Sequence, residues 1–216
     1  MRAYPRPLLC CALLFVLAAV PPLAGCAVNR MYNMWRDESF HAAAMRNVLV
    51  VAPRSDPVRR RIWEDSFVAG LAALGTKATA SYKIYADGVP DTLQVLEAVR
   101  RDGYDGLLVS TRLPDGTEQK FVPGYTRRES ITRQSGFTGA YYTVLEDVKV
   151  PSRTESVAVA IFETNVWTTT GGGRLVWSGS TRTSNNVDAS LIQHKVEKMI
   201  LPEMRRAGIV PGGAGR

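Results

Sequence analysis

The stretch NVLVVAP, residues 47–53, is a short run of apolar, mostly branched residues that ends at a proline. Runs of this length and composition, bounded by turn signals, are typical of strands that are buried on both faces. Such strands occur in parallel sheets whose two faces are covered by helices. The stretch therefore predicts an α/β fold, provided that helices follow it in the chain.

Two amphipathic helices are predicted downstream of this strand. The first begins at Asp56, which can cap the helix and precedes a proline, and it ends at Gly75. The second begins with a capping box formed by Asp91 and Gln94 and ends at Gly103. Apolar residues recur at helical spacing in both segments, so each helix is expected to bury one face.

Two further strands alternate with these helices. They are predicted at KATASY, residues 77–82, and at YDGLLVSTRL, residues 104–113. The order strand, helix, strand, helix, strand favours parallel pairing with right-handed crossovers.

The second half of the chain follows another pattern. Two strand-like runs flank TGGG, residues 170–173, and predict an antiparallel hairpin with a glycine turn. A terminal helix is expected from an N-cap at Asp188, with a kink or restart at Pro202. The predicted fold class is α/β, with a single domain over residues 47–210. This domain is expected to contain a mixed sheet of about five or more strands, two crossover helices, the antiparallel hairpin and the terminal helix. Residues 211–216 are expected to be a disordered tail.

Residues 1–25 have the layout of an export signal. Arg2 and Arg6 precede an apolar run, Leu8–Val20, and Pro21 and Pro22 follow it. A membrane-spanning helix needs about 20 apolar residues, and the prolines interrupt this run earlier. Residues 26–46 show no sustained period and are interpreted as a tether between the membrane and the domain.

The residues LAGC, 23–26, resemble the lipobox of bacterial lipoproteins. The resemblance implies cleavage between Gly25 and Cys26 and a lipid anchor on Cys26: diacylglycerol, with an acyl chain such as palmitate on the amine. Ala27 at the next position implies an outer-membrane location facing the periplasm. Cys26 is the single cysteine left after cleavage, so no internal disulfide can form. The alternative is an ordinary secretory signal that leaves Cys26 as a free thiol.

The charge of the mature chain is a moderate excess of basic groups. The full sequence has a formal net charge of +7, and loss of the two signal arginines leaves +5. Export makes nucleic acid an unsuitable partner, whereas anionic lipid or cell-wall polymer fits the charge. A solvated basic surface accounts for the same excess.

Residues that could carry catalysis are sparse. The two histidines, His41 and His194, are distant in sequence from other metal-ligating residues, so no metal site, cofactor or catalytic residue is predicted. The alternative is an envelope hydrolase that uses distant carboxylates, for instance Glu97, Glu146 or Glu163.

Two basic or glycine-rich motifs allow more than one interpretation. The run Arg59–Arg61 could bind an anion, or it could form a solvated helix face in which Arg60 pairs with Glu64 and Arg61 with Asp65. The TGGG motif lacks the lysine and the following helix of a phosphate-binding loop, which favours a hairpin turn.

Residues 114–152 are the candidate partner-binding segment. The segment is long, weakly periodic and rich in Gly, Thr and Ser, with a hairpin suggested around residues 141–144. Its aromatic residues suit recognition of another protein: Phe121, Tyr125, Phe137, Tyr141 and Tyr142. The alternative is that these residues cover one face of the sheet as extra strands.

The order of elements, with the phrases GYDGLLV (103–109) and LVWSGST (175–181), is similar to small α/β domains of bacterial envelope proteins. These include the TolB amino-terminal domain and the CsgG-like and penicillin-binding-protein-activator lipoproteins. The resemblance implies a non-catalytic lipoprotein whose periplasmic domain serves protein–protein interaction or envelope assembly. Alternatives are the cell-wall hydrolase and a subunit of an oligomeric secretion assembly.

Overall fold

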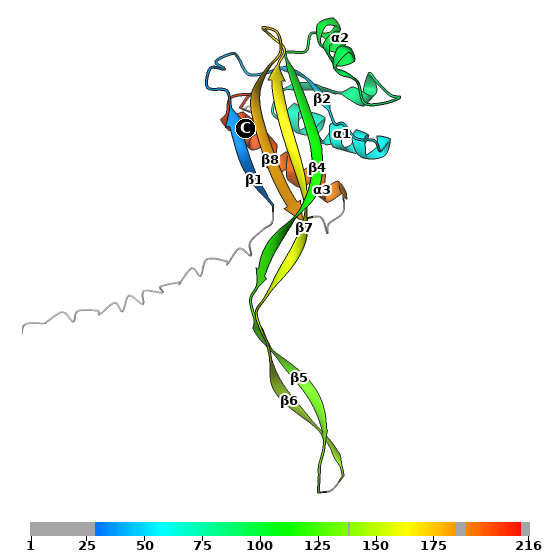
Figure 1. The fold of residues 1–216 in the computed structure, drawn as a ribbon, viewed down its shortest axis with the longest axis vertical. Coiled ribbons are helices and arrows are strands. Elements are labelled where there is room, and N and C mark those ends of the chain that lie inside the picture. Colours follow the sequence, from blue (N-terminus) through cyan, green and yellow to red (C-terminus); the bar gives the residue numbers. More distant parts are fainter. Residues whose placement is uncertain (1–28, 138, 185–188, 213–216) are drawn as a thin grey trace, which may run out of the picture.

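The computed structural model describes residues 29–137, 139–184 and 189–212. In these residues six strands form one mixed sheet in the order β1-β8-β7-β4-β2-β3 (Figure 1). The strands of this sheet are β1 (Arg30–Arg36), β2 (Asn47–Val51), β3 (Lys77–Ala80), β4 (Gly106–Val122), β7 (Arg153–Thr168) and β8 (Arg174–Ser184). Two further strands, β5 (Tyr125–Gln134) and β6 (Tyr141–Val150), pair only with each other in this part of the chain. The helices are α1 (Pro57–Ala73), α2 (Thr92–Asp102) and α3 (Ala189–Arg206), with a short 3₁₀ turn at Ser81–Lys83.

The strand β2 is the middle strand of the parallel part of the sheet, as the NVLVV pattern predicts. It pairs in parallel with β3 on one side and with β4 on the other, and its residues from Val48 to Val51 are all buried. The remaining neighbours, β4 with β7, β7 with β8 and β8 with β1, are antiparallel. The predicted fold class, an α/β single domain with a mixed sheet and a terminal helix, is confirmed.

Helices cover the two faces of the sheet unequally. On one face α1 and α3 pack over the larger core, which includes Phe67, Phe162 and Ile200. On the other face α2 covers a smaller cluster built around Leu49 and Ala98. This arrangement explains why apolar residues recur at helical spacing in the sequence, because each helix buries one side against the sheet and leaves the other in water.

The helix boundaries follow the capping signals in the sequence. Asp56 caps α1 by accepting hydrogen bonds from the backbone N–H groups of Val58 and Arg59, at 2.9 and 3.1 Å. Asp91 and Gln94 form the predicted capping box of α2, with reciprocal bonds of 2.8 and 2.9 Å. Pro202 lies inside α3, which continues through it. The residue predicted to cap α3, Asp188, lies outside the described residues.

The segment interpreted as a tether contributes to the fold. Residues 30–36 instead form β1, an edge strand that pairs with β8. Phe40 and Met45 are also buried, at 3% and 2% exposed, in the larger core. The sequence signal was weak because β1 alternates poorly: most of its side chains are exposed at the sheet edge.

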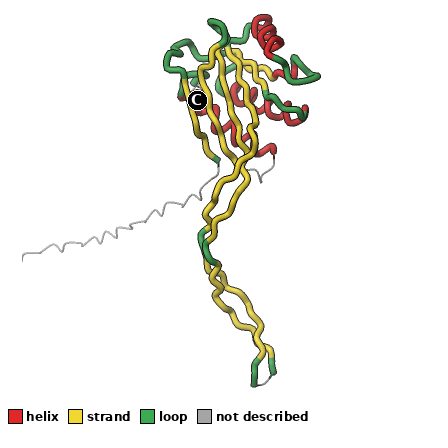
Figure 2. The backbone as a smooth tube through the Cα atoms, viewed as in Figure 1, coloured by secondary structure: helices red, strands yellow, loops and turns green. Residues whose placement is uncertain are grey.

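Residues 114–152 form extra strands, and residues 141–144 belong to a hairpin as suggested, but these strands do not cover a face of the six-stranded sheet. The strands β4 and β7 continue beyond the last described pair with β8, Val159 with Ser184. The strands β5 and β6 extend the same ribbon to its end, where Ser135 is hydrogen-bonded to Gly139 and Ala140. We call residues 117–158 the arm. Figure 2 shows it as a twisted two-stranded ribbon that projects from one end of the α/β body, with a short loop segment midway.

The hairpin of β7 and β8 has the glycine turn that the sequence predicts. Gly171, Gly172 and Gly173 all have positive φ angles, between 73° and 96°, which only glycine adopts without strain. This motif is therefore a turn between antiparallel strands.

The signal segment 1–25, the cleavage position and Cys26 lie outside the described residues, as do residues 213–216. No helix in the described ranges has the length and apolar character needed to cross a membrane.

Candidate functional site

The aromatic residues singled out in the sequence all lie on the arm. Phe121 is on β4, Tyr125 on β5, Phe137 in the terminal turn, and Tyr141 and Tyr142 at the start of β6. Their exposed fractions range from 49% for Tyr142 to 99% for Phe137. The structure brings them together in two groups, one at the tip and one at the middle of the arm.

The outer half of the arm has two chemically different faces. Directly paired residues of β5 and β6 point to the same side, and successive residues alternate between sides. One side, called here the apolar face, carries Tyr125, Ile131, Tyr142, Val144, Val148 and Val150. The opposite side is mostly polar, with Tyr141 and Leu145 among Thr126, Arg128, Ser130, Thr132, Thr143, Asp147 and Lys149.

The midpoint of the arm is a tight crossing of the two strands. Pro123 and Pro151 interrupt the ladder, since proline has no N–H to donate. A Cβ atom on Gly124 would lie 2.7 Å from both the Ser152 nitrogen and the Val150 oxygen. The glycine is therefore required by the close approach of the opposite backbone, and the crossing separates the inner and outer halves of the arm.

Ion pairs along the arm are exposed. Arg128 and Asp147, which are opposite in register, are 3.0 Å apart. Glu146 faces Glu129 across the ribbon, and each forms an ion pair with an arginine, Glu146 with Arg133 and Glu129 with Arg127. Exposed pairs of this kind contribute at most about 1 kcal/mol each. An isolated two-stranded ribbon is marginally stable in water, so the arm is stabilised weakly by its own contacts.

The root of the arm lies beside the first described residues. Asn29 accepts hydrogen bonds from Thr183 and Ser184 at the end of β8. The guanidinium of Arg30 forms an ion pair with Glu118 of the arm at 2.9 Å. The strand β1 therefore begins at the end of the body from which the arm projects, as Figure 1 also shows.

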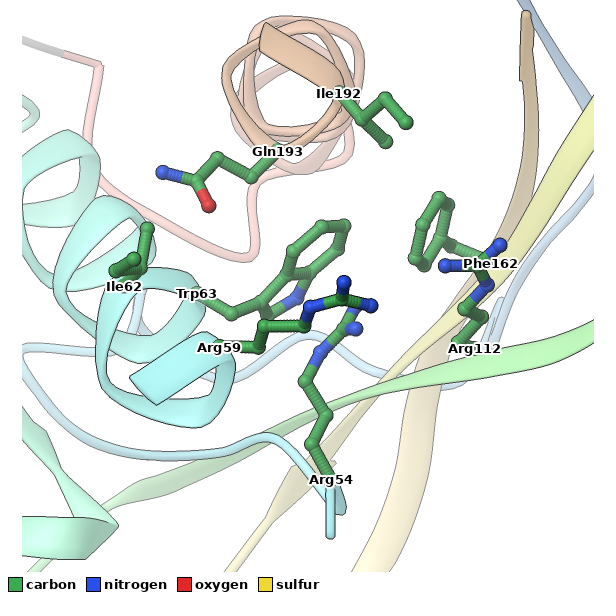
Figure 3. Close-up of a pocket in the computed structure, with 8 residues that line it drawn as sticks. All are labelled: Arg54, Arg59, Ile62, Trp63, Arg112, Phe162, Ile192 and Gln193. Carbon is green, nitrogen blue, oxygen red and sulfur yellow. The ribbon is translucent and has the colours of Figure 1, made fainter. Parts of the chain in front are cut away.

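A second site, which we call the arginine pocket, lies where β2, α1, β4 and α3 meet. Figure 3 shows the ends of Arg54 and Arg59 near the Trp63 ring and the end of Arg112 near Phe162. The guanidinium carbon of Arg54 is 4.1 Å from the Trp63 ring centre, and that of Arg112 is 5.9 Å from the Phe162 ring centre. These residues, with Ile62, Ile192 and Gln193, line a cavity of about 40 Å³.

The electrostatics of this pocket centre on Arg54. Burial, and then the positive charges of Arg112 and Arg59, lower the pKa of Arg54 to about 10. Because this pKa lies below the ordinary value for arginine, the charged group destabilises the folded state at every pH below about 10. This loss of stability decreases only when the pH rises from the pKa of Arg54 in the folded chain toward the ordinary pKa of arginine. An anion in the pocket would oppose the same effect.

Sequence reasoning found only part of the arginine pocket. The run Arg59–Arg61 was a candidate for anion binding, and Arg59 does line the pocket. Arg54 and Arg112 are 58 residues apart in the chain and meet only through the pairing of β2 with β4. No local pattern marks such a pair, so no signal in the single sequence could have found it.

The interpretation of Arg60 and Glu64 as a solvated pair is wrong, because both side chains are buried. They are 3% and 0% exposed, and Arg60 Nε lies 3.1 Å from Glu64 Oε1. The carboxylate also accepts bonds from Ser81 Oγ and from the backbone nitrogens of Ala52 and Tyr82, at 2.7, 3.0 and 2.9 Å. The guanidinium donates to the carbonyl oxygens of Tyr85 and Gly88. The pair is covered by the loop after β3, which the helix pattern could not indicate.

The remaining candidates for catalysis lie apart. Glu97 is on α2, Glu146 is on the arm, and Glu163 is on β7, where it accepts a hydrogen bond from Asn165. His194 is exposed and lies 3.7 Å from Glu197 on the same helix. Within the described residues, no three His, Cys, Asp or Glu side chains are grouped so as to hold a metal ion.

A larger groove lies between α2 and the glycine turn of the β7–β8 hairpin. Its volume is about 690 Å³, and its walls include Val95 and Val99 of α2, Val109 of β4 and Gly172 of the turn. It lies over the face of the sheet that α2 covers.

No protein family and no curated protein matches the chain. Similar solved structures include the PelC dodecamer from Paraburkholderia phytofirmans, which is 11% identical over 85% of this chain and 98% of that chain, with a TM-score of 0.44. A single-substitution variant of that dodecamer is 13% identical over 81% of this chain and 95% of that chain, with a TM-score of 0.43. A PDZ domain protein from Parabacteroides distasonis is 9% identical over 80% of this chain and 36% of that chain, with a TM-score of 0.34. With TM-scores below 0.5, none of these likenesses bears on the function of the chain.

Proposed function

We propose that this chain is a non-catalytic, lipid-anchored envelope protein that uses its arm to bind another envelope protein. The observation that carries the proposal is the arm itself: a two-stranded ribbon that leaves the body and presents an apolar face on which no other described strand or helix packs. At about 3.3 Å per residue, its six inner and ten outer ladder positions extend roughly 50 Å. A ribbon of this kind gains stability when a third strand pairs with its edge or when another surface packs on its apolar face.

The charges on the apolar face favour a protein partner over lipid. Arg127, Glu129, Arg133 and Glu146 alternate with the apolar residues on that side. Such charges are costly in the hydrocarbon of a bilayer, whereas a protein surface can pair with them. Aromatic side chains with arginines between them are also the composition of protein–protein hot spots.

The membrane anchor would place the arm close to the membrane. Cys26 lies three residues before Asn29, a distance of at most about 10 Å along an extended chain. Asn29 is bound at the root of the arm. The partner is therefore expected to be held at the membrane surface.

Adjacent tyrosines on opposite faces provide a test of the arm. Tyr142→Ser removes an aromatic side chain from the apolar face, and Tyr141→Ser makes the same change on the polar face. Loss of a hot-spot residue costs about 2 kcal/mol, so Tyr142→Ser should weaken partner binding about 30-fold, with little effect of Tyr141→Ser. The measurement is quantitative pull-down from crosslinked envelopes, with the mass of each crosslinked product determined.

Equal retention of every partner by Tyr142→Ser and by the parent would contradict the proposal, as would equal losses in the two variants. A product whose mass is a whole-number multiple of the chain mass would identify the partner as a further copy of the chain. A product of any other mass would identify a different envelope protein.

The lipid anchor has its own prediction. Cys26→Ala removes the thiol that carries the lipid, so the chain should be recovered in the soluble periplasmic fraction rather than with outer membranes. Membrane fractionation with antibody detection measures this, with the parent chain as the control. Membrane retention of the variant equal to that of the parent would refute the anchor.

A further inference from the structure

The arginine pocket has the chemistry of an anion site. Three guanidinium groups converge on it from three different elements, Arg54 after β2, Arg59 in α1 and Arg112 in β4. Among the described residues, two carboxylates pair with these arginines, Asp56 with Arg59 and Asp115 with Arg112, and neither of these two ion pairs includes Arg54. We propose that this pocket binds a phosphate-type oxyanion, either on a lipid headgroup or free in solution.

Donors in the pocket remain without acceptors. Nε and Nη2 of Arg54 and Nε1 of Trp63 are buried and have no hydrogen-bond partner among the described residues. Arg112, by contrast, donates to Asp115 at 2.7–3.2 Å, and Arg59 lies 3.5 Å from Asp56. Buried donors of this kind are costly unless an acceptor is supplied. An oxyanion supplies one, and it also compensates the uncompensated charge of Arg54.

The shape of the pocket selects the class of anion. A carboxylate is satisfied by the fork of one guanidinium, whereas the oxygens of a phosphate point in several directions and can contact several forks. The cavity of about 40 Å³ holds roughly three water molecules, at about 10–15 Å³ for each. It therefore admits a single oxyanion group and excludes a whole nucleotide or sugar.

The position of the pocket favours a lipid as the source of that group. In the register of the sheet, Arg112 on β4 lies in one row with Phe162 on β7, Thr181 on β8 and Met31 on β1. Three strand spacings of about 4.8 Å put Arg112 about 15 Å from Met31. Met31 is the fifth residue after Cys26, so four residues lie between them. With the anchor of the proposed function in place, the pocket lies within reach of lipid headgroups.

Calorimetric titration of the full chain in detergent tests the site. Sodium phosphate should bind, and sodium chloride at equal ionic strength should not. Arg54→Met should weaken phosphate binding at least tenfold, whereas Arg205→Met, which removes an exposed arginine near the end of α3, should leave it unchanged. Without phosphate, Arg54→Met should also melt at a higher temperature than the parent, because it removes a partly buried charge whose pKa is lowered by burial and by the neighbouring arginines, while the methionine keeps an apolar contact with Trp63. A folded variant that melts higher separates loss of the site from loss of the fold.

A short-chain phosphatidic acid distinguishes the two sources of the oxyanion. Tighter binding of dihexanoyl phosphatidic acid than of phosphate, again lost in Arg54→Met, identifies a lipid headgroup site. Equal affinities identify a site for the free ion. Absence of binding by both compounds, or binding that Arg54→Met leaves unchanged, overturns the proposal. These titrations depend on neither the lipid anchor nor the arm, so they can fail while the proposed function holds.

Discussion

Replacing Glu64 with alanine should lower the free energy of unfolding by about 3–5 kcal/mol, because it leaves the buried guanidinium of Arg60 without its carboxylate. The same change removes the acceptor for Ser81 Oγ and for two backbone N–H groups. For a chain of this size the loss corresponds to a fall of roughly 10 °C in melting temperature. Urea unfolding of the full chain measures it as a shift of the midpoint at constant slope.

Two further variants separate the buried charge from other causes. Glu97→Ala makes the same change on the exposed face of α2 and should cost no more than about 0.5 kcal/mol. The double variant Arg60→Met with Glu64→Leu removes both charges and should recover part of the loss. A loss below about 1 kcal/mol for Glu64→Ala would show that water or another group replaces the carboxylate.

Phe162→Ala should be comparably destabilising, by about 3–5 kcal/mol, through a cavity in the larger core. The Phe162 side chain is 1% exposed, and its ring stacks on that of Trp63 with centroids 4.4 Å apart. Removing the ring takes away the contact that positions Trp63 beneath the guanidinium of Arg54. We therefore expect phosphate binding to weaken together with stability.

Phe121→Ala is the matched control for this prediction. It removes the same side chain from the arm, where Phe121 is 66% exposed, and should change the unfolding free energy by less than about 0.5 kcal/mol. The two variants are compared by urea unfolding under identical conditions. Similar losses for both would contradict the assignment of Phe162 to the core and of the arm to a separate, weakly stabilised element.

Local signals predicted most of the body of this protein. The capping residues Asp56 and Asp91, the glycine turn at residues 171–173 and the apolar run 47–51 each act within a few residues of themselves, and each forms the element expected of it. The candidate partner residues were also located in one segment. The shape of that segment was missed, because paired strands without a covered face carry little periodic signal.

The tertiary structure shows that one charged pair, expected to be solvated, is buried. The i,i+4 spacing of Arg60 and Glu64 established that they meet, but their burial depends on the loop at residues 81–88, which packs over the helix. Spacing along a helix contains no information about what covers it. A pair interpreted as a surface feature is therefore one of the main internal contacts of the fold.

The sequence by itself determined the strands and helices between residues 47 and 113, the glycine-turn hairpin and the segment that carries exposed aromatics, since these depend on neighbours in the chain. Only the tertiary structure decided that the segment is a projecting arm, that residues 30–36 complete the sheet, and that Arg54, Arg59 and Arg112 share one pocket. The physical reason is that these features are contacts between residues far apart in the chain. Such contacts are specified by how strands pair and how helices pack, and no short pattern records them.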